Sequence, residues 1–128
     1  MVGTSTRGTA TATVLVVEDE PLLRMDAVDF LHEEGFLVIE AGSGDEGLIL
    51  LRNRPEVMVL FTDIHMPGSL NGLELARVAA SDFKHVRLLI VSGRGVPNVT
   101  DLPPGAHFMA KPYEVSAVLA HIHEVMRA

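Results

Sequence analysis

The sequence contains no cysteine, and basic residues are scarce. A chain without cysteine has no disulfide framework, no thiolate metal site and no thiol nucleophile, and a reducing cytoplasm is its natural setting. Its 10 Lys and Arg stand against 17 Asp and Glu, which gives a formal net charge of −7. Binding to nucleic acid requires a basic face that neutralises phosphates, so we expect no nucleic-acid partner.

Long apolar runs are also missing. None approaches the roughly 20 residues that a helix needs to cross a bilayer, so we expect a soluble, cytoplasmic protein without a membrane partner. Residues 1–12 are rich in Thr, Ala and Gly and lack the apolar core of a signal peptide, which predicts a flexible N-terminal tail. The remaining residues, 13–128, suit one domain, because a chain of this size buries enough surface for an independent core.

Short β-branched runs alternate with longer amphipathic stretches along the chain. This alternation predicts a doubly wound α/β fold, in which a parallel sheet is covered by helices on both faces. The expected strands are 14–17, 37–41, 57–63, 87–91 and 107–110. The expected helices run from Pro21 toward Gly35, from a capping box at 43–46 to about Leu51, from Asn71 onward, and from about Glu114 to Met126.

One helix of the alternating pattern is interrupted. Between residues 94 and 104 the chain carries Gly95, Pro97, Pro103 and Pro104. A proline inside a helix costs roughly 3 kcal/mol, and the residue before it is pushed out of helical geometry. We therefore predict that the fourth helix is missing, or is short and spans at most about two turns between Pro97 and Pro103.

Chemically active side chains stand at the ends of four predicted strands: Glu18 and Asp19, Asp63, Ser92, and Lys111. Ligands of open parallel sheets bind at the carboxyl ends of the strands. If the first and third strands are neighbours, the three carboxylates meet in one crevice, where like charges need a counter-ion. Oxygen ligands of this kind suit Mg²⁺, so the sequence predicts a Mg²⁺ site.

This order of an acid pair, an acid, a hydroxyl and a Lys-Pro pair resembles the receiver domain of bacterial two-component response regulators. The resemblance covers roughly residues 13 to 127 and implies a flavodoxin-like fold with a five-stranded parallel sheet. It also implies that Asp63 accepts a phosphoryl group, that Asp19 and Asp63 bind Mg²⁺ directly, and that Glu18 binds it through water. The backbone carbonyl of His65 would be a further metal ligand.

Other positions that match the family would act on the phosphoryl group. Lys111 would supply a positive charge, and the resemblance implies a cis peptide bond between Lys111 and Pro112. Ser92 would donate a hydrogen bond from its hydroxyl to a phosphoryl oxygen. Ser92 and Phe108 match the family's switch pair, although Phe108 lacks the tyrosine hydroxyl that is common at this position.

His65 and Arg94 match positions that flank the phosphoryl group and influence how fast water reaches it. The resemblance thus implies a stand-alone, chemotaxis-regulator-like receiver that accepts a phosphoryl group from a histidine kinase or a phosphotransfer protein. The phosphorylated form would change conformation and signal to a downstream protein, which the sequence does not identify. Apart from catalysing its own phosphorylation and dephosphorylation, such a protein is not an enzyme.

Two alternative functions remain open. A haloacid-dehalogenase-like phosphatase also uses a strand-end Asp and Mg²⁺, but it requires a second Asp two residues later, where this chain has His65. A pseudo-receiver would bind partners without being phosphorylated. Such a binding module has no need of the acid pair, Asp63, Ser92 and Lys111.

Two further patterns carry less weight. The stretch 42–47 reads G-x-G-x-x-G between a predicted strand and helix, as in dinucleotide-binding sites. It follows the second strand rather than the first, and the chain is short for two mononucleotide-binding halves, so the receiver interpretation is favoured. The six histidines show no metal-site spacing, and His121 and His123 would point to different sides of a helix.

Overall fold

The computed structural model describes residues 12–95 and 97–127. The predicted N-terminal tail therefore lies outside the described residues, except for Ala12. Ala12 is buried, and its carbonyl accepts a hydrogen bond of 3.0 Å from the N–H of Leu37. Ala12, one residue before the first strand, thus already belongs to the packed core.

The predicted α/β fold with five parallel strands is confirmed. The strands are β1 (Thr13–Val17), β2 (Leu37–Ala41), β3 (Val57–Asp63), β4 (Arg87–Ser92) and β5 (His107–Ala110). They form one parallel sheet in the order β2-β1-β3-β4-β5. The chain adds β2 on one side of β1 and β3 on the other, so the winding direction reverses at β1 and β3. This reversal opens a crevice at the carboxyl ends of these two strands.

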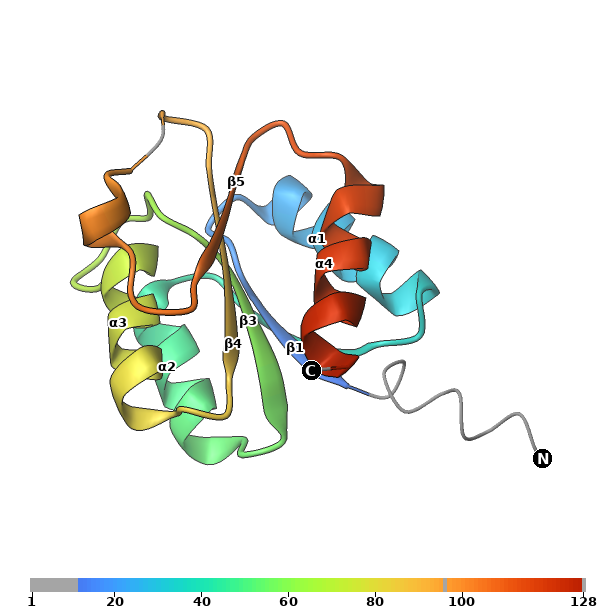
Figure 1. Ribbon diagram of the computed structural model, residues 1–128, viewed down its shortest axis with the longest axis horizontal. Coiled ribbons are helices and arrows are strands. Elements are labelled where there is room, and N and C mark those ends of the chain that lie inside the picture. Colours follow the sequence, from blue (N-terminus) through green and yellow to red (C-terminus); the bar gives the residue numbers. More distant parts are fainter. Residues whose placement is uncertain (1–11, 96, 128) are drawn as a thin grey trace.

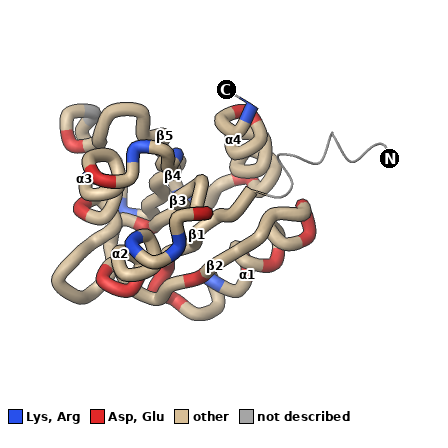
Figure 2. Tube along the Cα trace, turned by 90° about the horizontal axis from the view of Figure 1, so that it is seen from below, with Lys and Arg blue, Asp and Glu red and all other residues tan. Residues whose placement is uncertain are grey.

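Four α-helices cover the two faces of the sheet. They are α1 (Pro21–Glu33), α2 (Gly44–Asn53), α3 (Gly72–Asp82) and α4 (Val115–Arg127). Helices α1 and α4 lie on one face, and α2 and α3 lie on the other (Figure 1). In Figure 2 the charged residues lie mainly on the helices and loops, whereas the strands are mostly uncharged. Within residues 12–95 and 97–127, no helix has the length and apolar character needed to cross a membrane.

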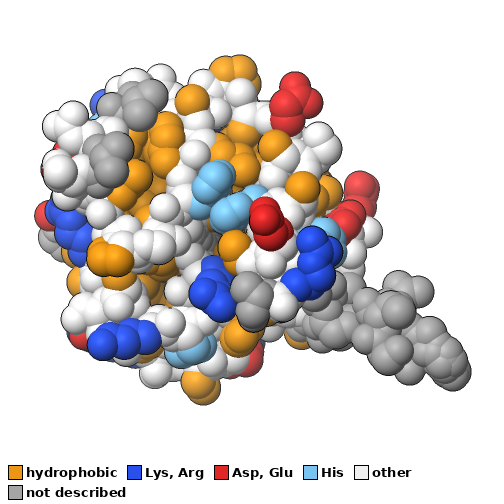
Figure 3. Space-filling view, viewed as in Figure 1, with side chains coloured by type: hydrophobic (Ala, Val, Ile, Leu, Met, Phe, Trp, Pro, Cys, Tyr) orange, Lys and Arg blue, Asp and Glu red, His pale blue; other side chains and the backbone are white. Residues whose placement is uncertain are grey.

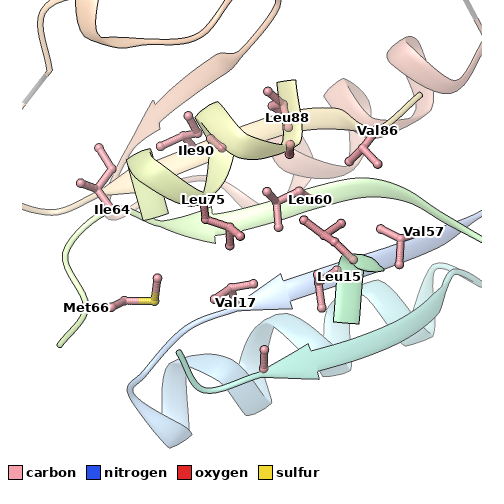
Figure 4. Close-up of a cluster of buried hydrophobic side chains, with 14 residues drawn as sticks. Leu15, Val17, Val57, Leu60, Ile64, Met66, Leu75, Val86, Leu88 and Ile90 are labelled. Carbon is pink, nitrogen blue, oxygen red and sulfur yellow. The ribbon is translucent and has the colours of Figure 1, made fainter. Parts of the chain in front are cut away.

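Two layers of apolar side chains hold the helices to the sheet. Leu15, Leu60 and Leu75 lie in the layer beneath α2 and α3, and each is fully buried (Figure 4). The second layer, beneath α1 and α4, includes Leu31 and Ile122. Because the central strands are buried on both faces, they read in the sequence as continuous apolar runs.

Side chains cap the helices largely as predicted. Asn71 accepts a hydrogen bond from the N–H of Glu74, whose carboxylate accepts one from the N–H of Asn71, which completes a capping box. At α2, Ser43 accepts a hydrogen bond from the N–H of Glu46. The expected return bond differs, because the Glu46 carboxylate accepts from the N–H of Gly42 instead of Ser43. This bond ties the end of β2 to the first turn of α2.

The prediction that the helix between β4 and β5 is short or missing is confirmed. Among the described residues between β4 and β5, the only helical segment is a single 3₁₀ turn, Val99–Asp101. The Arg77 side chain on α3 donates a hydrogen bond of 2.9 Å to the carbonyl of Asp101. A side chain of α3 thus holds a turn where the alternating pattern would place a whole helix.

The glycines of the G-x-G-x-x-G stretch serve packing. A Cβ atom on Gly44 would lie 2.1 Å from the carbonyl oxygen of Leu70, which is closer than any real contact. A Cβ atom on Gly47 would lie 3.0 Å from the Leu75 side chain and 3.1 Å from the Val17 side chain. The small residues therefore let α2 approach its neighbours, and the dinucleotide interpretation is not needed to explain them.

The close approach at Gly44 gives a testable result. Replacing glycine by alanine usually favours a helix, but here the added methyl group would meet rigid backbone. Gly44→Ala should lower the free energy of unfolding by more than about 1 kcal/mol, as measured by urea denaturation. Gly47→Ala is the matched control and should lose less, since its Cβ would meet movable side chains. Equal stability of Gly44→Ala and the wild type would contradict the packing.

Candidate functional site

The candidate site lies where β1 and β3 end. These strands are hydrogen-bonded neighbours, with Val17 paired to Thr62, so the residues that come after them enter the same crevice. Glu18 and Asp19 follow β1, and Asp63 is the last residue of β3. The first and third strands are therefore neighbours, which is the arrangement that brings the three carboxylates into one crevice.

Three carboxylates and one ammonium meet in this crevice. Glu18, Asp19 and Asp63 each offer a carboxylate oxygen, and these oxygens lie within 4.8 Å of one another. The Nζ atom of Lys111 lies 2.8 Å from Oε1 of Glu18 and 3.1 Å from Oδ2 of Asp63. The Lys111–Pro112 peptide bond is cis, as the resemblance implied. Lys111 thus bridges carboxylates from two strands.

Burial and ion pairing shift the pKa values of two of these groups. Burial raises the pKa of Glu18, while the hydrogen bonds from Lys111 and from the N–H of Glu20 act in the opposite direction. Burial also acts to lower the pKa of Lys111, but its hydrogen bonds to Glu18 and Asp63 outweigh this effect and raise it. The carboxylates of Glu18 and Asp63 therefore hold Lys111 in its charged form.

The backbone around Asp63 is fixed by two contacts. The N–H of Ile64 donates a hydrogen bond of 2.7 Å to Oδ1 of Asp63, which orients the carboxylate. Gly72, the first residue of α3, packs directly on the Asp63 carbonyl, because a Cβ atom at Gly72 would lie 1.6 Å from that oxygen. Sequence reasoning missed Gly72, since the contact depends on how the loop after β3 folds back.

Arg24 on α1 is a second residue that the sequence did not reveal. Its guanidinium donates a hydrogen bond of 2.7 Å to the carbonyl of Glu18 and forms an ion pair of 3.1 Å with Glu40 on β2. These bonds fix the backbone of the loop that carries the acid pair. Arg24 is therefore a positioning residue. The signal available in the sequence was an arginine within the first turn of a helix that directly follows the acid pair.

The predicted modulators His65 and Arg94 reach the same place. Both line a hollow of about 250 Å³, together with Asp19, Asp63 and Lys111. Both residues are exposed, as suits loop positions. The structure thus brings these two residues next to the carboxylates from the loops after β3 and β4.

Ser92 lies at the end of β4, beside the predicted acceptor. It directly follows Val91, the register partner of Asp63, and its carbonyl accepts a hydrogen bond of 2.9 Å from the N–H of Lys111. The Ser92 side chain is buried, and its hydroxyl oxygen accepts a hydrogen bond of 3.2 Å from the N–H of Arg94. The hydroxyl is thus engaged by its own loop in this structure.

Phe108, the predicted switch aromatic, lies on β5 opposite Ile90 and is half-buried against the α2–α3 side of the core. Tyr113 packs on the other side, with its ring centroid 6.1 Å from that of Phe30 and 5.8 Å from that of Phe61. Burial raises the pKa of Tyr113. The two aromatic residues therefore belong to opposite layers of the core.

The donor set of the crevice suits a hard divalent cation. It consists of carboxylate oxygens, which Mg²⁺ prefers, and no cysteine is available to favour a softer metal. The site also places Lys111 beside the carboxylate of Asp63. A carboxylate, a cation site and a lysine within reach of one another can bind and transfer a phosphoryl group.

The fold and the crevice define an α/β domain with an acidic site at its switch point, and the comparisons identify its family. A family model described as the response regulator receiver domain matches residues 14–123. The chain belongs to this family of receiver domains of two-component response regulators. Receiver domains interact with histidine kinases and are generally not conventional enzymes.

Relatives of similar sequence support this assignment to the receiver family. The chain is 32% identical to the sensor kinase CckA of Brucella abortus over 119 residues, which covers 90% of this chain and 12% of that protein. It is 30% identical to the transcriptional regulatory protein PdtaR of Mycobacterium tuberculosis over 115 residues, covering 85% of this chain and 54% of the relative. The chain thus spans about half the length, or less, of these relatives.

Among solved structures, a response regulator receiver protein from Sinorhizobium medicae superposes with a TM-score of 0.86 at 24% identity, covering 92% of this chain and 96% of that one. The receiver domain of the hybrid histidine kinase CckA gives a TM-score of 0.74 at 27% identity, with 88% and 96% covered. The comparisons lend no support to the alternatives of a haloacid-dehalogenase-like phosphatase or a non-phosphorylated binding module.

The crowding of carboxylates predicts an effect on stability. Asp19→Asn removes one of three mutually repelling charges, and it should raise the free energy of unfolding of the metal-free protein by a few tenths to about 1 kcal/mol. Mg²⁺ should raise the melting temperature of the wild type more than that of Asp19→Asn, because ligand binding to the folded state stabilises it.

Asp29→Asn is the matched control, since Asp29 is an exposed carboxylate on α1 that does not line the hollow. This variant should keep the full response to Mg²⁺. An equal Mg²⁺ response in Asp19→Asn and the wild type would mean that the ion binds elsewhere.

Proposed function

We propose that Asp63 accepts a phosphoryl group, in a Mg²⁺-dependent reaction, from a phosphohistidine of a histidine kinase or phosphotransfer protein. The observation that carries this proposal is the position of the Asp63 carboxylate among Glu18, Asp19 and Lys111, where it lines the hollow. A carboxylate oxygen of Asp63 would form the new bond to phosphorus, and the bond from phosphorus to the donor's nitrogen would break. The product is an aspartyl phosphate.

The neighbouring residues have separate tasks in this proposal. Glu18, Asp19 and Asp63 would hold Mg²⁺, with the backbone carbonyl of His65 as a further ligand, and the bound ion would neutralise charge on the phosphoryl oxygens. Lys111 would leave its pairing with Glu18 and Asp63 in part to contact a phosphoryl oxygen, where a flexible point charge serves well. The chain would act on itself alone, catalysing its own phosphorylation and dephosphorylation.

The phosphoryl group would also change the conformation around β4 and β5. The Ser92 hydroxyl would turn from its present contact with Arg94 to donate a hydrogen bond to a phosphoryl oxygen. Phe108, half-buried on the neighbouring strand, would follow into the space that is released. His65 and Arg94, which line the hollow, would influence how fast water reaches the phosphoryl group.

The proposed compartment is the cytoplasm, because a chain without cysteine suits a reducing environment.

Phosphorylation can be tested with a small donor. Acetyl phosphate and Mg²⁺ should add one phosphoryl group to the intact chain, detected by mass spectrometry as a base-labile adduct. Asp63→Asn should remove this adduct, because an amide oxygen is a far weaker nucleophile than a carboxylate. Asp29→Asn, at an exposed position on α1, is the control and should label like the wild type. Undiminished labelling of Asp63→Asn would refute the assignment.

A second test concerns the segment between β4 and β5. Its described part holds one 3₁₀ turn and few buried apolar side chains, so it should open locally at low free energy. Hydrogen exchange of its amides should slow when Mg²⁺ and beryllofluoride, a phosphoryl mimic, are added, while exchange in β1 should not change. Strong protection across residues 97–102 in both states would contradict a segment that becomes ordered upon phosphorylation.

A further inference from the structure

A groove runs beside α3, next to the segment that connects β4 to β5. It consists of two hollows of about 380 and 180 Å³, which share Ala80 and Pro104. Arg77 lines the first hollow from α3, and Val86 and Leu88 line the second at the start of β4. We call these two adjoining hollows the α3 groove.

The α3 groove lies where the winding of the sheet would place a helix. Along the sheet, the chain moves from β4 to β5 in the same direction as from β3 to β4. Crossovers between parallel strands are right-handed, so the connection after β4 belongs on the same face as α3. Leu102 and Ala106 of this connection do pack against the core on that face.

This connection leaves one flank of α3 without a neighbouring helix. On its other flank α3 contacts α2. Between β4 and β5, the described part of the chain offers a single 3₁₀ turn, Val99–Asp101, in place of a full helix. A flank that the alternating pattern would cover with a helix therefore remains open as the α3 groove.

The floor of the α3 groove is apolar. Val86 and Leu88 belong to the core beneath α3, and the half-buried Ala80 packs against it. Pro103 and Pro104 add two further apolar side chains from the connecting segment. An apolar strip alongside a helix suits the apolar side of an amphipathic helix, which is a common mode of recognition between proteins.

The rim of the α3 groove is basic, although the chain as a whole is acidic. Among the described residues that line it, Arg77, Lys84 and Arg87 are basic and Asp101 is acidic. The whole chain has the opposite balance, with 10 basic and 17 acidic residues. On the left of Figure 3, hydrophobic side chains lie between Lys or Arg side chains over α3 and the connecting segment. Positive charge thus surrounds an apolar strip.

These basic side chains are available to a partner. Arg77, Lys84 and Arg87 are all exposed. Within residues 12–95 and 97–127 none of the three forms an ion pair with a carboxylate, and Arg77 donates a hydrogen bond to the uncharged carbonyl of Asp101. Complementary charge across an interface selects the partner and speeds its association, so this rim favours an acidic partner.

We propose that the α3 groove binds an amphipathic helix of a partner protein, with Asp or Glu residues along the edges of its apolar side. The helix would lie beside α3, at the place where the alternating pattern expects a helix of this chain. Its apolar side would cover Ala80, Val86 and Leu88, and its carboxylates would meet the basic rim. A nucleic acid fits less well, because the floor is apolar and the net charge of the chain is −7.

This surface is separate from the carboxylate cluster. The hollow at Asp63 and the α3 groove have no lining residue in common. Binding of a helix in the α3 groove goes beyond the proposed phosphoryl transfer and does not require it. The test below uses the chain without a phosphodonor, so its failure leaves the labelling of Asp63 untouched.

The test begins with selection of binders to the full chain from a display library of amphipathic helices of about 18 residues, or five turns. Their apolar positions are leucine, and their polar positions are drawn equally from glutamate, lysine, serine and glutamine. The selected helices should be enriched in glutamate over lysine, because the rim is basic. Absence of binders, or equal shares of glutamate and lysine among them, would overturn the proposal.

Charge reversal at the rim then locates the binding. The double variant Lys84→Glu, Arg87→Glu should weaken binding of a selected helix at least about tenfold, because attraction becomes repulsion at two positions. The double variant Arg52→Glu, Arg127→Glu has the same net charge and is the matched control. Both of its positions are exposed, on α2 and α4, and line neither hollow, so it should bind like the wild type.

A substitution in the floor tests the same place without a change of charge. Ala80→Gln adds a longer side chain at the residue that both hollows share, so it should also weaken binding. Thermal denaturation checks that each variant is folded. If the selected helices bind the Lys84→Glu, Arg87→Glu variant and the Ala80→Gln variant like the wild type, they bind elsewhere and the proposal is wrong.

Discussion

The Lys111 ammonium lies 2.8 Å from a Glu18 oxygen and 3.1 Å from an Asp63 oxygen, and the side chains of all three residues are largely buried. Carboxylates within 4.8 Å of one another repel strongly where water is partly excluded. A cation between them removes much of this repulsion. The same lysine comes after β5, whereas the two acids lie at the ends of β1 and β3, so this ion pair ties the ends of three strands together.

The rest of the site depends on backbone that is held in place around this ion pair. Arg24 fixes the carbonyl of Glu18, and Gly72 allows the first turn of α3 to rest on the carbonyl of Asp63. Both contacts act on main chain, so each sets the direction in which a carboxylate enters the crevice. By contrast, the described part of the segment between β4 and β5 holds a single 3₁₀ turn, so we expect this segment to open locally at low free energy.

The fold and the four strand-end positions could be predicted because both depend on local pattern. Apolar runs mark buried strands, and parallel strands bring the residues at their carboxyl ends to one edge of the sheet. The prolines around residues 97 and 103 likewise exclude a long helix by local geometry. Contacts between residues that meet only in the folded tertiary structure could not be predicted. Arg24 meets Glu18 and His107 meets His121 only after helices have packed on the sheet, and the Glu46 carboxylate accepts from Gly42 rather than from Ser43.

The most direct test of this account is the stability of Lys111→Met in the absence of divalent metal. The variant keeps the length of the side chain but leaves Glu18 and Asp63 without their shared cation. Its free energy of unfolding should fall by more than about 1.5 kcal/mol, because hydrogen bonds to charged groups contribute on this scale. Lys84→Met, at an exposed lysine, should change it by less than about 0.5 kcal/mol. Equal losses in the two variants would contradict the central role of the ion pair.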